Sequence, residues 1–334
     1  MDFTAVDKRI AALEATRAKP CKVSPTEPLA VGLDLGTAYI VLAVVDSRQR
    51  PVACAVQSAQ VVRDGLVVDY AGGLRMVRAL REQLEDSLGR KLEKTAIAVP
   101  PGTGERDCAT HRHVAEGAGL EVTALLDEPT AANNVLGVRD GAIVDIGGGT
   151  TDIAVLSLGG KVKATSVRVA GNHYDDEILK HVRNKFSIAI GQRTAEQLKK
   201  NVACCPQKAD FDETMEVKGR SLLTGLPIKV NVSTSDLYEP VMMLSEQIGT
   251  AAHQVLEKTP PELAGDIFRN GVVLTGGGAQ LHGLPEYLSQ ELKVDVTVSP
   301  DPVNCVALGT AMSLGLNDKL ETGFLDATPR MGRR

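Results

Sequence analysis

Residues 29–46 read LAVGLDLGTAYIVLAVVD, and residues 141–158 read GAIVDIGGGTTDIAVLSL. Each stretch is an apolar run that ends in Asp, an aliphatic residue and Gly, followed by a tight Gly/Thr turn and a second apolar run. This pattern predicts two β-hairpins. The equivalent aspartates, Asp34 and Asp145, lie 111 positions apart (145 − 34), far more than the period of a solenoid repeat. The sequence therefore predicts a duplicated domain with one hairpin at the centre of each half.

A third Gly-rich turn, Thr275 to Gly278, also follows an apolar run. Glycine lacks a Cβ atom, so the N–H groups of such turns can close around an anion, and threonine hydroxyls add donors. The strand-end aspartates would repel phosphate unless a cation lay between them, and Mg²⁺ bridges carboxylates to phosphates in this way. The alternative is three ordinary hairpin turns whose glycines supply positive φ. Two matched aspartates favour the phosphate site, and the absence of GxxxxGK[ST] and GxGxxG excludes P-loop and Rossmann sites.

Four segments resemble the motifs of the actin and heat-shock-chaperone superfamily and occur in the family's order. GLDLGT (32–37) is similar to the first phosphate motif, DEPTAA (127–132) to the first connecting motif, DIGGGTTD (145–152) to the second phosphate motif and LTGGGAQLHGL (274–284) to the adenosine motif. The resemblance implies an α/β fold, namely a duplicated two-lobed actin-like ATPase with ribonuclease-H-like lobes on mixed sheets. It also implies ATP with Mg²⁺ in the cleft between the lobes.

The resemblance assigns roles residue by residue. Asp34 and Asp145 would hold hydrated Mg²⁺, Glu128 would orient or deprotonate water, and Asp152 would assist it. The nucleotide would contact three glycine turns and one helix, at Gly36, Thr37, Gly147, Gly148, Gly149, Thr150, Glu196, Lys199, Gly276, Gly277 and Gly278. Simpler interpretations stay open. Glu128 fits an acid favoured at a helix start, Asp152 a hairpin surface acid, and Glu196 with Lys199 a surface ion pair.

Two groups within the superfamily share further segments with the chain. The ethanolamine-utilisation protein EutJ is similar at VRDGLVVDY (62–70), VPPGT (99–103), AGLEV (118–122) and LDEPTA (126–131). The rod-shape actin homologue MreB is similar at AGNHYDDEILKHVR (170–183), IGQRTAEQLK (190–199) and GRSLLTGLPIKV (219–230). The leading expectation is a EutJ-like, chaperone-like accessory protein of a bacterial microcompartment that uses ATP binding and slow hydrolysis as a conformational switch. It implies a client protein of an ethanolamine or related pathway, and shell proteins, as partners.

Other functions remain open. The main alternative is an MreB-like cytoskeletal protein that forms filaments on ATP, and a weaker one is a sugar or acetate kinase, for which no acceptor-substrate motif is evident. No segment between Asp46 and Lys94 matches the catalytic-lysine region of heat-shock chaperones, and no peptide-binding domain follows the adenosine turn. Fast hydrolysis and peptide clamping are therefore not expected. No membrane-inserting apolar segment of the kind found in rod-shape proteins is evident. We therefore expect monomers or small oligomers with ATP.

Composition narrows the partners and the location. The 334 residues carry a net charge of −5, without the clustered basic face of a nucleic-acid-binding protein. No apolar run reaches the roughly 18 residues of a membrane span, and the charged N-terminus lacks the apolar core of a secretory signal. Six cysteines without a CxxC pair are typical of reduced cytosolic proteins. The expected location is cytoplasmic, with association with a microcompartment.

The expected divisions are an N-terminal amphipathic helix and linker (1–28), lobe I (29–140), lobe II (141–318) and an exposed tail (319–334). Within lobe II, a less regular polar stretch should run to Thr234, and one helix at 235–258 should lead into the strand before the third turn. Phe3, Val6, Ile10 and Leu13 form an apolar stripe on the N-terminal helix. That helix would either dock onto a shell or partner, or fold back onto its own domain, since isolated helices this short are marginal in water.

Overall fold

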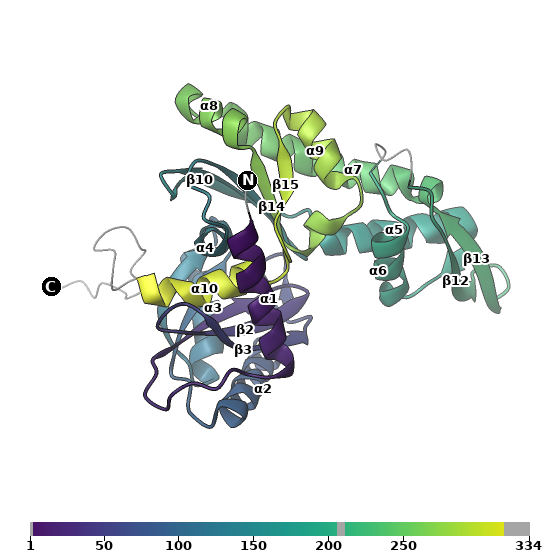
Figure 1. The fold of residues 1–334 in the computed structure, drawn as a ribbon. Coiled ribbons are helices and arrows are strands. Elements are labelled where there is room, and N and C mark those ends of the chain that lie inside the picture. Colours follow the sequence, from purple (N-terminus) through teal and green to yellow (C-terminus); the bar gives the residue numbers. More distant parts are fainter. Residues whose placement is uncertain (1–2, 206–210, 317–334) are drawn as a thin grey trace.

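Two five-stranded sheets with the same strand order organise the molecule, in a computed structural model that describes residues 3–205 and 211–316. In each sheet the first three strands pair antiparallel and the last two join in parallel. The lobe I sheet has the order β3-β2-β1-β6-β7, and the lobe II sheet has the order β10-β9-β8-β14-β15 (Figure 1). This equivalence confirms the predicted duplicated, two-lobed α/β fold, with hairpins β1–β2 and β8–β9 at the two centres. The strands are β1 (Leu29–Leu35), β2 (Tyr39–Asp46), β3 (Pro51–Ser58), β6 (Lys94–Val99), β7 (Glu121–Asp127), β8 (Gly141–Ile146), β9 (Thr151–Ser157), β10 (Gly160–Val167), β14 (Val272–Thr275) and β15 (Val296–Val298).

Helices cover both faces of the lobe I sheet, which is why its strands are nearly continuous apolar runs. Leu33 and Leu42 face a core shared with α2 and α3, while Val41 and Ala43 face a core shared with α10. Gly32 lies on the α10 side, where a Cβ atom would collide with the backbone of that helix. The helices around this sheet are α1 (Thr4–Ala18), α2 (Tyr70–Leu88), α3 (Glu105–Gly117), α4 (Glu128–Leu136) and α10 (Cys305–Leu316).

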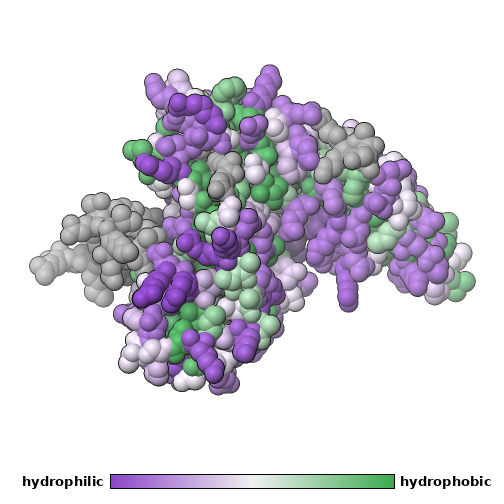
Figure 2. Space-filling model, viewed as in Figure 1, coloured by the Kyte–Doolittle hydropathy of each residue, from purple (hydrophilic) through white to green (hydrophobic). Residues whose placement is uncertain are grey.

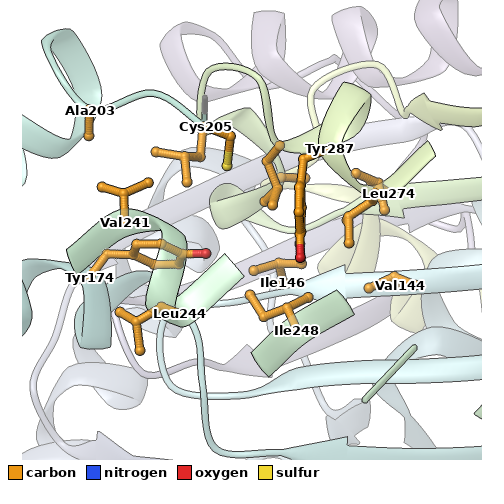
Figure 3. Close-up of a cluster of buried hydrophobic side chains, with 14 of the residues drawn as sticks. Val144, Ile146, Tyr174, Ala203, Cys205, Val241, Leu244, Ile248, Leu274 and Tyr287 are labelled. Carbon is orange, nitrogen blue, oxygen red and sulfur yellow. The ribbon is translucent and has the colours of Figure 1, made fainter. Parts of the chain in front are cut away.

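The lobe II core is built where α5, α7 and α9 pack on β8 and β14. In Figure 3, Ile146, Cys205, Leu244 and Tyr287 converge from different elements. The buried Tyr174 hydroxyl lies 3.0 Å from the Ser245 hydroxyl, so its polar atom is paired inside the core. The helices of this lobe are α5 (Gly171–Phe186), α6 (Gln192–Asn201), α7 (Thr234–Glu257), α8 (Pro261–Asn270) and α9 (Leu284–Leu292).

The N-terminal helix α1 folds back onto lobe I beside β3 and α10 (Figure 1). Val6, Ile10 and Leu13 are at most 6% exposed and belong to the same core as Val41 of β2. The side-chain amide of Asn304, next to α10, donates a 2.6 Å hydrogen bond to Glu14 Oε1. Because the apolar stripe is already buried within the chain, it is not free to dock onto a shell or a partner.

Lobe II departs from the sequence expectations in several places. The expected irregular stretch contains a hairpin of β12 (Thr214–Ser221) and β13 (Pro227–Ser233), joined by β11 (Ile188–Ala189) in a three-stranded sheet. A separate helix, α8, follows α7, and residues 305–316, assigned to lobe II, form a helix that packs on the lobe I sheet. The expected tail at 319–334 lies outside the described residues. Within the described ranges, no helix is long and apolar enough to cross a membrane. The remaining short elements are β4 (Val62–Arg63), β5 (Leu66–Val67) and the 3₁₀ turn η1 (Gly277–Gln280).

Candidate functional site

A cavity of about 710 Å³ lies between the lobes, and all three Gly-rich turns open into it. It is lined by residues from both central hairpins, by the start of α4, and by α6 and η1. The expected site residues found in its wall are Asp34, Gly36, Thr37, Glu128, Asp145, Gly147, Gly148, Gly149, Thr150, Glu196, Lys199, Gly276, Gly277 and Gly278. Asp152 lies behind this wall, opposite Asp145 on the paired strand.

The second turn is held by the N-terminus of α5. The Gly171 and Asn172 N–H groups donate to the carbonyls of Gly147 and Gly148, at 3.0 and 2.8 Å. In a trans peptide the N–H points opposite to the carbonyl of the same unit, so the N–H groups of Gly148 and Gly149 point away from α5. Since these glycines line the cavity, the turn presents backbone donors suited to phosphate oxygens.

The two phosphate turns touch each other across the cleft. A Cβ atom on Gly149 would lie 2.6 Å from Thr37 Oγ1 and 2.8 Å from the backbone nitrogen of Asp64. No real side chain tolerates such contacts, so glycine is required at this position by the close approach of the lobes. Beside it, His173 Nε2 of α5 lies 3.7 Å from Asp64 Oδ1 in lobe I. The cleft is therefore closed on this side by contacts between the lobes.

Four carboxylates gather at the base of the cavity. Burial raises the pKa of Asp34 to about 7 and that of Asp152 to about 6. Burial, with repulsion from Asp152 and Asp34, raises the pKa of Asp145 well above its usual range. The pKa of Glu128 is raised in the same way, by burial and by repulsion from Asp152, Asp34 and Asp145. Such a group of acids is poorly compensated by the protein alone and suits a bound cation.

The carboxylates of the cavity fit a cation that keeps its water ligands better than one coordinated only by protein side chains. Asp145 Oδ2 and Asp152 Oδ1 are buried without a hydrogen-bond partner among the described residues. In that same part of the chain, no three His, Cys, Asp or Glu side chains are grouped to ligate a metal directly. Mg²⁺ characteristically keeps several waters and takes one or two carboxylates together with substrate phosphates. Asp34 and Asp145 therefore fit a magnesium ion held largely through water and phosphate.

Glu196 and Lys199 line the cavity but do not pair with each other. Glu196 Oε1 forms a 2.6 Å ion pair with Lys200, and Lys199 Nζ lies 2.9 Å from a carboxylate oxygen of Asp175. Lys199 also donates to the Gly171 carbonyl at 2.9 Å, which ties α6 to the start of α5. The simpler interpretation, an ion pair between the two residues, is wrong. Both side chains reach the cavity wall, but the Lys199 ammonium group is already bound to Gly171 and Asp175 of α5.

Sequence reasoning missed several residues of the cavity wall. Gly171 and Asn172 follow a strand and open α5, a pattern typical of anion sites at helix N-termini, and this signal was available in the sequence. The others carry no local signal, because they reach the cavity only through tertiary packing. The missed lining residues include Gly171, Asn172, Lys200, His282, Val303 and Asn304.

The buried acids predict that the nucleotide-free protein is more stable in mild acid. Their pKa values are higher in the folded than in the unfolded protein, so the folded state binds more protons and stability falls as pH rises from about 4 to above 7. Carboxyls with a lowered pKa, such as Asp236 at about 2, act in the opposite direction but only at lower pH. We expect a higher melting temperature at about pH 5.5 than at about pH 8, measured by calorimetry.

The matched control for this pH dependence is the double variant Asp34→Asn/Asp145→Asn, which should flatten the profile over the same interval. A wild-type melting temperature that rises or stays constant between these pH values would show that the acids are already compensated inside the protein.

Comparisons with known proteins agree with this geometry. The family model for MreB/Mbl protein matches residues 48–322. The cell shape-determining protein Mbl of Bacillus cereus is 35% identical over 302 residues, covering 88% of this chain and 90% of Mbl. The crystal structure of MreB5 of Spiroplasma citri bound to ADP is 28% identical with a TM-score of 0.77, covering 87% of this chain and 98% of that one. The crystal structure of EutJ from Carboxydothermus hydrogenoformans is 32% identical with a TM-score of 0.70, covering 92% and 97%.

These findings confirm the superfamily and correct the expected function. EutJ is a structural neighbour, but the matching family model and the Mbl relative are those of cell-shape proteins. The expected EutJ-type chaperone of a microcompartment pathway is therefore wrong, and so are its client and shell partners. The alternative left open by the sequence, an MreB-like cytoskeletal protein, agrees with the comparisons.

Proposed function

This chain belongs to the MreB/Mbl family, and from that membership we propose that it is a nucleotide-dependent cytoskeletal protein that assembles with copies of itself. The observation that carries the proposal is the interlobe cavity, in which Asp34 and Asp145 face one space between two glycine turns. The structure of a 28% identical MreB5 bound to AMPPNP supports a nucleotide at this place. The proposed assembly of copies of the chain replaces the prediction from the sequence that the protein forms monomers or small oligomers with ATP.

The proposed ligand is ATP with Mg²⁺. The N–H groups of Gly148 and Gly149 and the Thr37 hydroxyl would take the phosphates, Gly276 to Gly278 would pass under the adenosine, and Glu196 would be the nearer partner for the ribose. Asp34 and Asp145 would hold the ion, which when bound neutralises phosphate charge and offsets the repulsion among the acids. Lobe I, proposed at 29–140 together with α10, and lobe II, proposed at 141–304, would close on the nucleotide.

Hydrolysis is assigned to the carboxylate pair at the start of α4. Glu128 is the first residue of that helix and lines the cavity, and the nearby Asp152 carboxylate contributes to its raised pKa. The Thr150 hydroxyl donates to Asp152 Oδ2 at 3.3 Å, and Ser166 lies opposite Asp152 on the neighbouring strand. We propose that Glu128 orients and deprotonates the attacking water while Asp152 fixes its carboxyl group. No lysine is assigned to this step.

The exposed end of the β12–β13 hairpin supports assembly. Leu223 and Leu226 are 84% and 65% exposed, and Leu222 and Ile228 are 41% and 42% exposed. Figure 2 shows apolar side chains at this right-hand extremity of an otherwise largely hydrophilic face. Apolar side chains gathered on a projecting hairpin are typical of a protein interface. We propose that this end contacts a second copy of the chain.

Sedimentation with and without Mg-ATP, followed by electron microscopy, tests the proposal. We expect most of the protein to pellet with ATP and to form visible filaments. Leu223→Asp should abolish pelleting while the nucleotide still raises the melting temperature, because Leu223 does not line the cavity. Asp86→Ala, at an acid on α2, is the control that should pellet normally. Monomeric wild-type protein at saturating ATP would contradict assembly.

A further inference from the structure

The β9–β10 hairpin of lobe II contacts α4 at its N-terminal cap and at its middle. Asp127 caps the helix, since its Oδ1 accepts the Thr130 N–H at 2.9 Å. Its other carboxylate oxygen forms an ion pair with Lys161 of β10. Farther along the helix, the Asn133 side chain donates to the carbonyls of Val138 and Gly159. The β9–β10 hairpin therefore backs α4 at both its start and its middle.

This ion pair is well placed to act on the candidate catalytic carboxylate. Asp127 is 9% exposed and directly precedes Glu128, so any tilt of the helix start moves Glu128 with it. Strand β10 also carries Ser166, which lies directly opposite Asp152 of β9 in the sheet register. Strand β10 of lobe II thus lies beside both Asp127 and Asp152, the two carboxylates next to Glu128. Lys161 itself does not line the cavity.

We infer that Lys161 is a positioning residue for Glu128, acting through Asp127 across the junction of the two lobes. The inference rests on the proposed hydrolytic role of Glu128. Lys161 joins β10 of lobe II to the end of β7 in lobe I, so it couples the placement of the catalytic carboxylate to the relative position of the lobes. The Asn133 contact with Gly159 joins the middle of α4 to lobe II, whereas Lys161 makes the contact at the helix start, next to Glu128.

A purely structural role for Lys161 predicts a different result. If the ion pair only compensates a buried charge, its loss lowers stability and leaves turnover per folded molecule unchanged. If the ion pair positions Glu128, its loss lowers turnover but leaves nucleotide affinity unchanged. The reason is that the proposed phosphate contacts are made by the glycine turns and not by Lys161 or Asp127. Misplacing a catalytic group by about 1 Å can cost about a hundredfold in rate.

The experiment measures steady-state ATP hydrolysis and nucleotide affinity for five variants of the full chain. Lys161→Met should lower kcat by about tenfold or more with KM changed by less than about twofold, and Lys161→Arg should restore most of it. Lys163→Met removes the same charge from the same strand and should behave as wild type. Asp127→Asn keeps a good helix cap, and combining it with Lys161→Met should add no further loss, since both act through one contact.

The outcomes separate this inference from the proposed function. Wild-type hydrolysis that does not depend on Glu128 would remove the basis of both. Glu128-dependent hydrolysis that Lys161→Met leaves within about twofold of wild type would overturn the positioning role alone. A melting temperature lowered by Lys161→Met and recovered in the double variant, with kcat normal in both, would assign the pair to stability only.

Discussion

Replacing Asp145 by alanine should remove most of the thermal stabilisation that we expect Mg-ATP to give this protein. A ligand that binds only the folded state stabilises it by about 2.7 kcal/mol at a hundred times its dissociation constant. Asp145 is 3% exposed, opens into the cavity and has one carboxylate oxygen without a hydrogen-bond partner among the described residues. Without this carboxylate, the ion that joins the protein to the phosphates loses one of its two proposed supports.

The nucleotide-free variant should remain folded and should even gain stability near pH 8. The reason is that the substitution removes one of four mutually repelling acids. Differential scanning calorimetry with and without Mg-ATP measures both effects. Asp86→Ala is the control, and its nucleotide-induced shift should equal that of the wild type. A full shift retained by Asp145→Ala would remove the proposed site.

Replacing Glu128 by glutamine should abolish most of the proposed ATP turnover and leave nucleotide binding intact. Removing one positioned transition-state group typically costs about a hundredfold or more in kcat. Glutamine keeps the size and the hydrogen-bonding reach of the side chain toward Asp152, but it cannot accept a proton from water. Phosphate release measures the turnover, and calorimetric titration measures the nucleotide affinity. Together they separate an effect on catalysis from an effect on binding.

The control for Glu128 is Glu105→Gln, at the same position of another helix. Glu105 is the first residue of α3, as Glu128 is of α4, but it does not line the cavity. If Glu128 were only an acid favoured by the helix dipole, both variants would lose a small and similar amount of stability and would turn over ATP as the wild type does. A normal rate in Glu128→Gln would assign hydrolysis to another group.

The motifs predicted the fold because phosphate and backbone chemistry act locally. Asp34, Asp145 and the glycines that follow them mark strand ends and turns whose conformation depends on the next few residues. The miss of the β12–β13 hairpin has another cause, because its signal was present in the sequence. Met215 and Val217 on β12, and Ile228, Val230 and Val232 on β13, alternate with polar residues, as in a half-buried strand. The structure buries Val217 and Val232 in the lobe II core.

The family within the superfamily required comparison over the whole chain. The segments around Gly36 and Gly147 serve nucleotide chemistry common to chaperones and filament proteins, so they do not separate EutJ from MreB/Mbl. The segment GRSLLTGLPIKV (219–230), which forms much of the exposed hairpin, was similar to MreB in the sequence.

By itself, the sequence determined the duplicated hairpins, the three glycine turns and the identity of the acids, since each follows from residue type and spacing within one short stretch. Only the tertiary structure decided which groups meet. Asp34, Glu128 and Asp145 come from different strands and a helix and reach one cavity because two sheets pack around it. Packing also buried the stripe of α1 and gave Asp127 the partner Lys161. Such choices depend on burial and on distances between remote elements, and these exist only once the chain is folded.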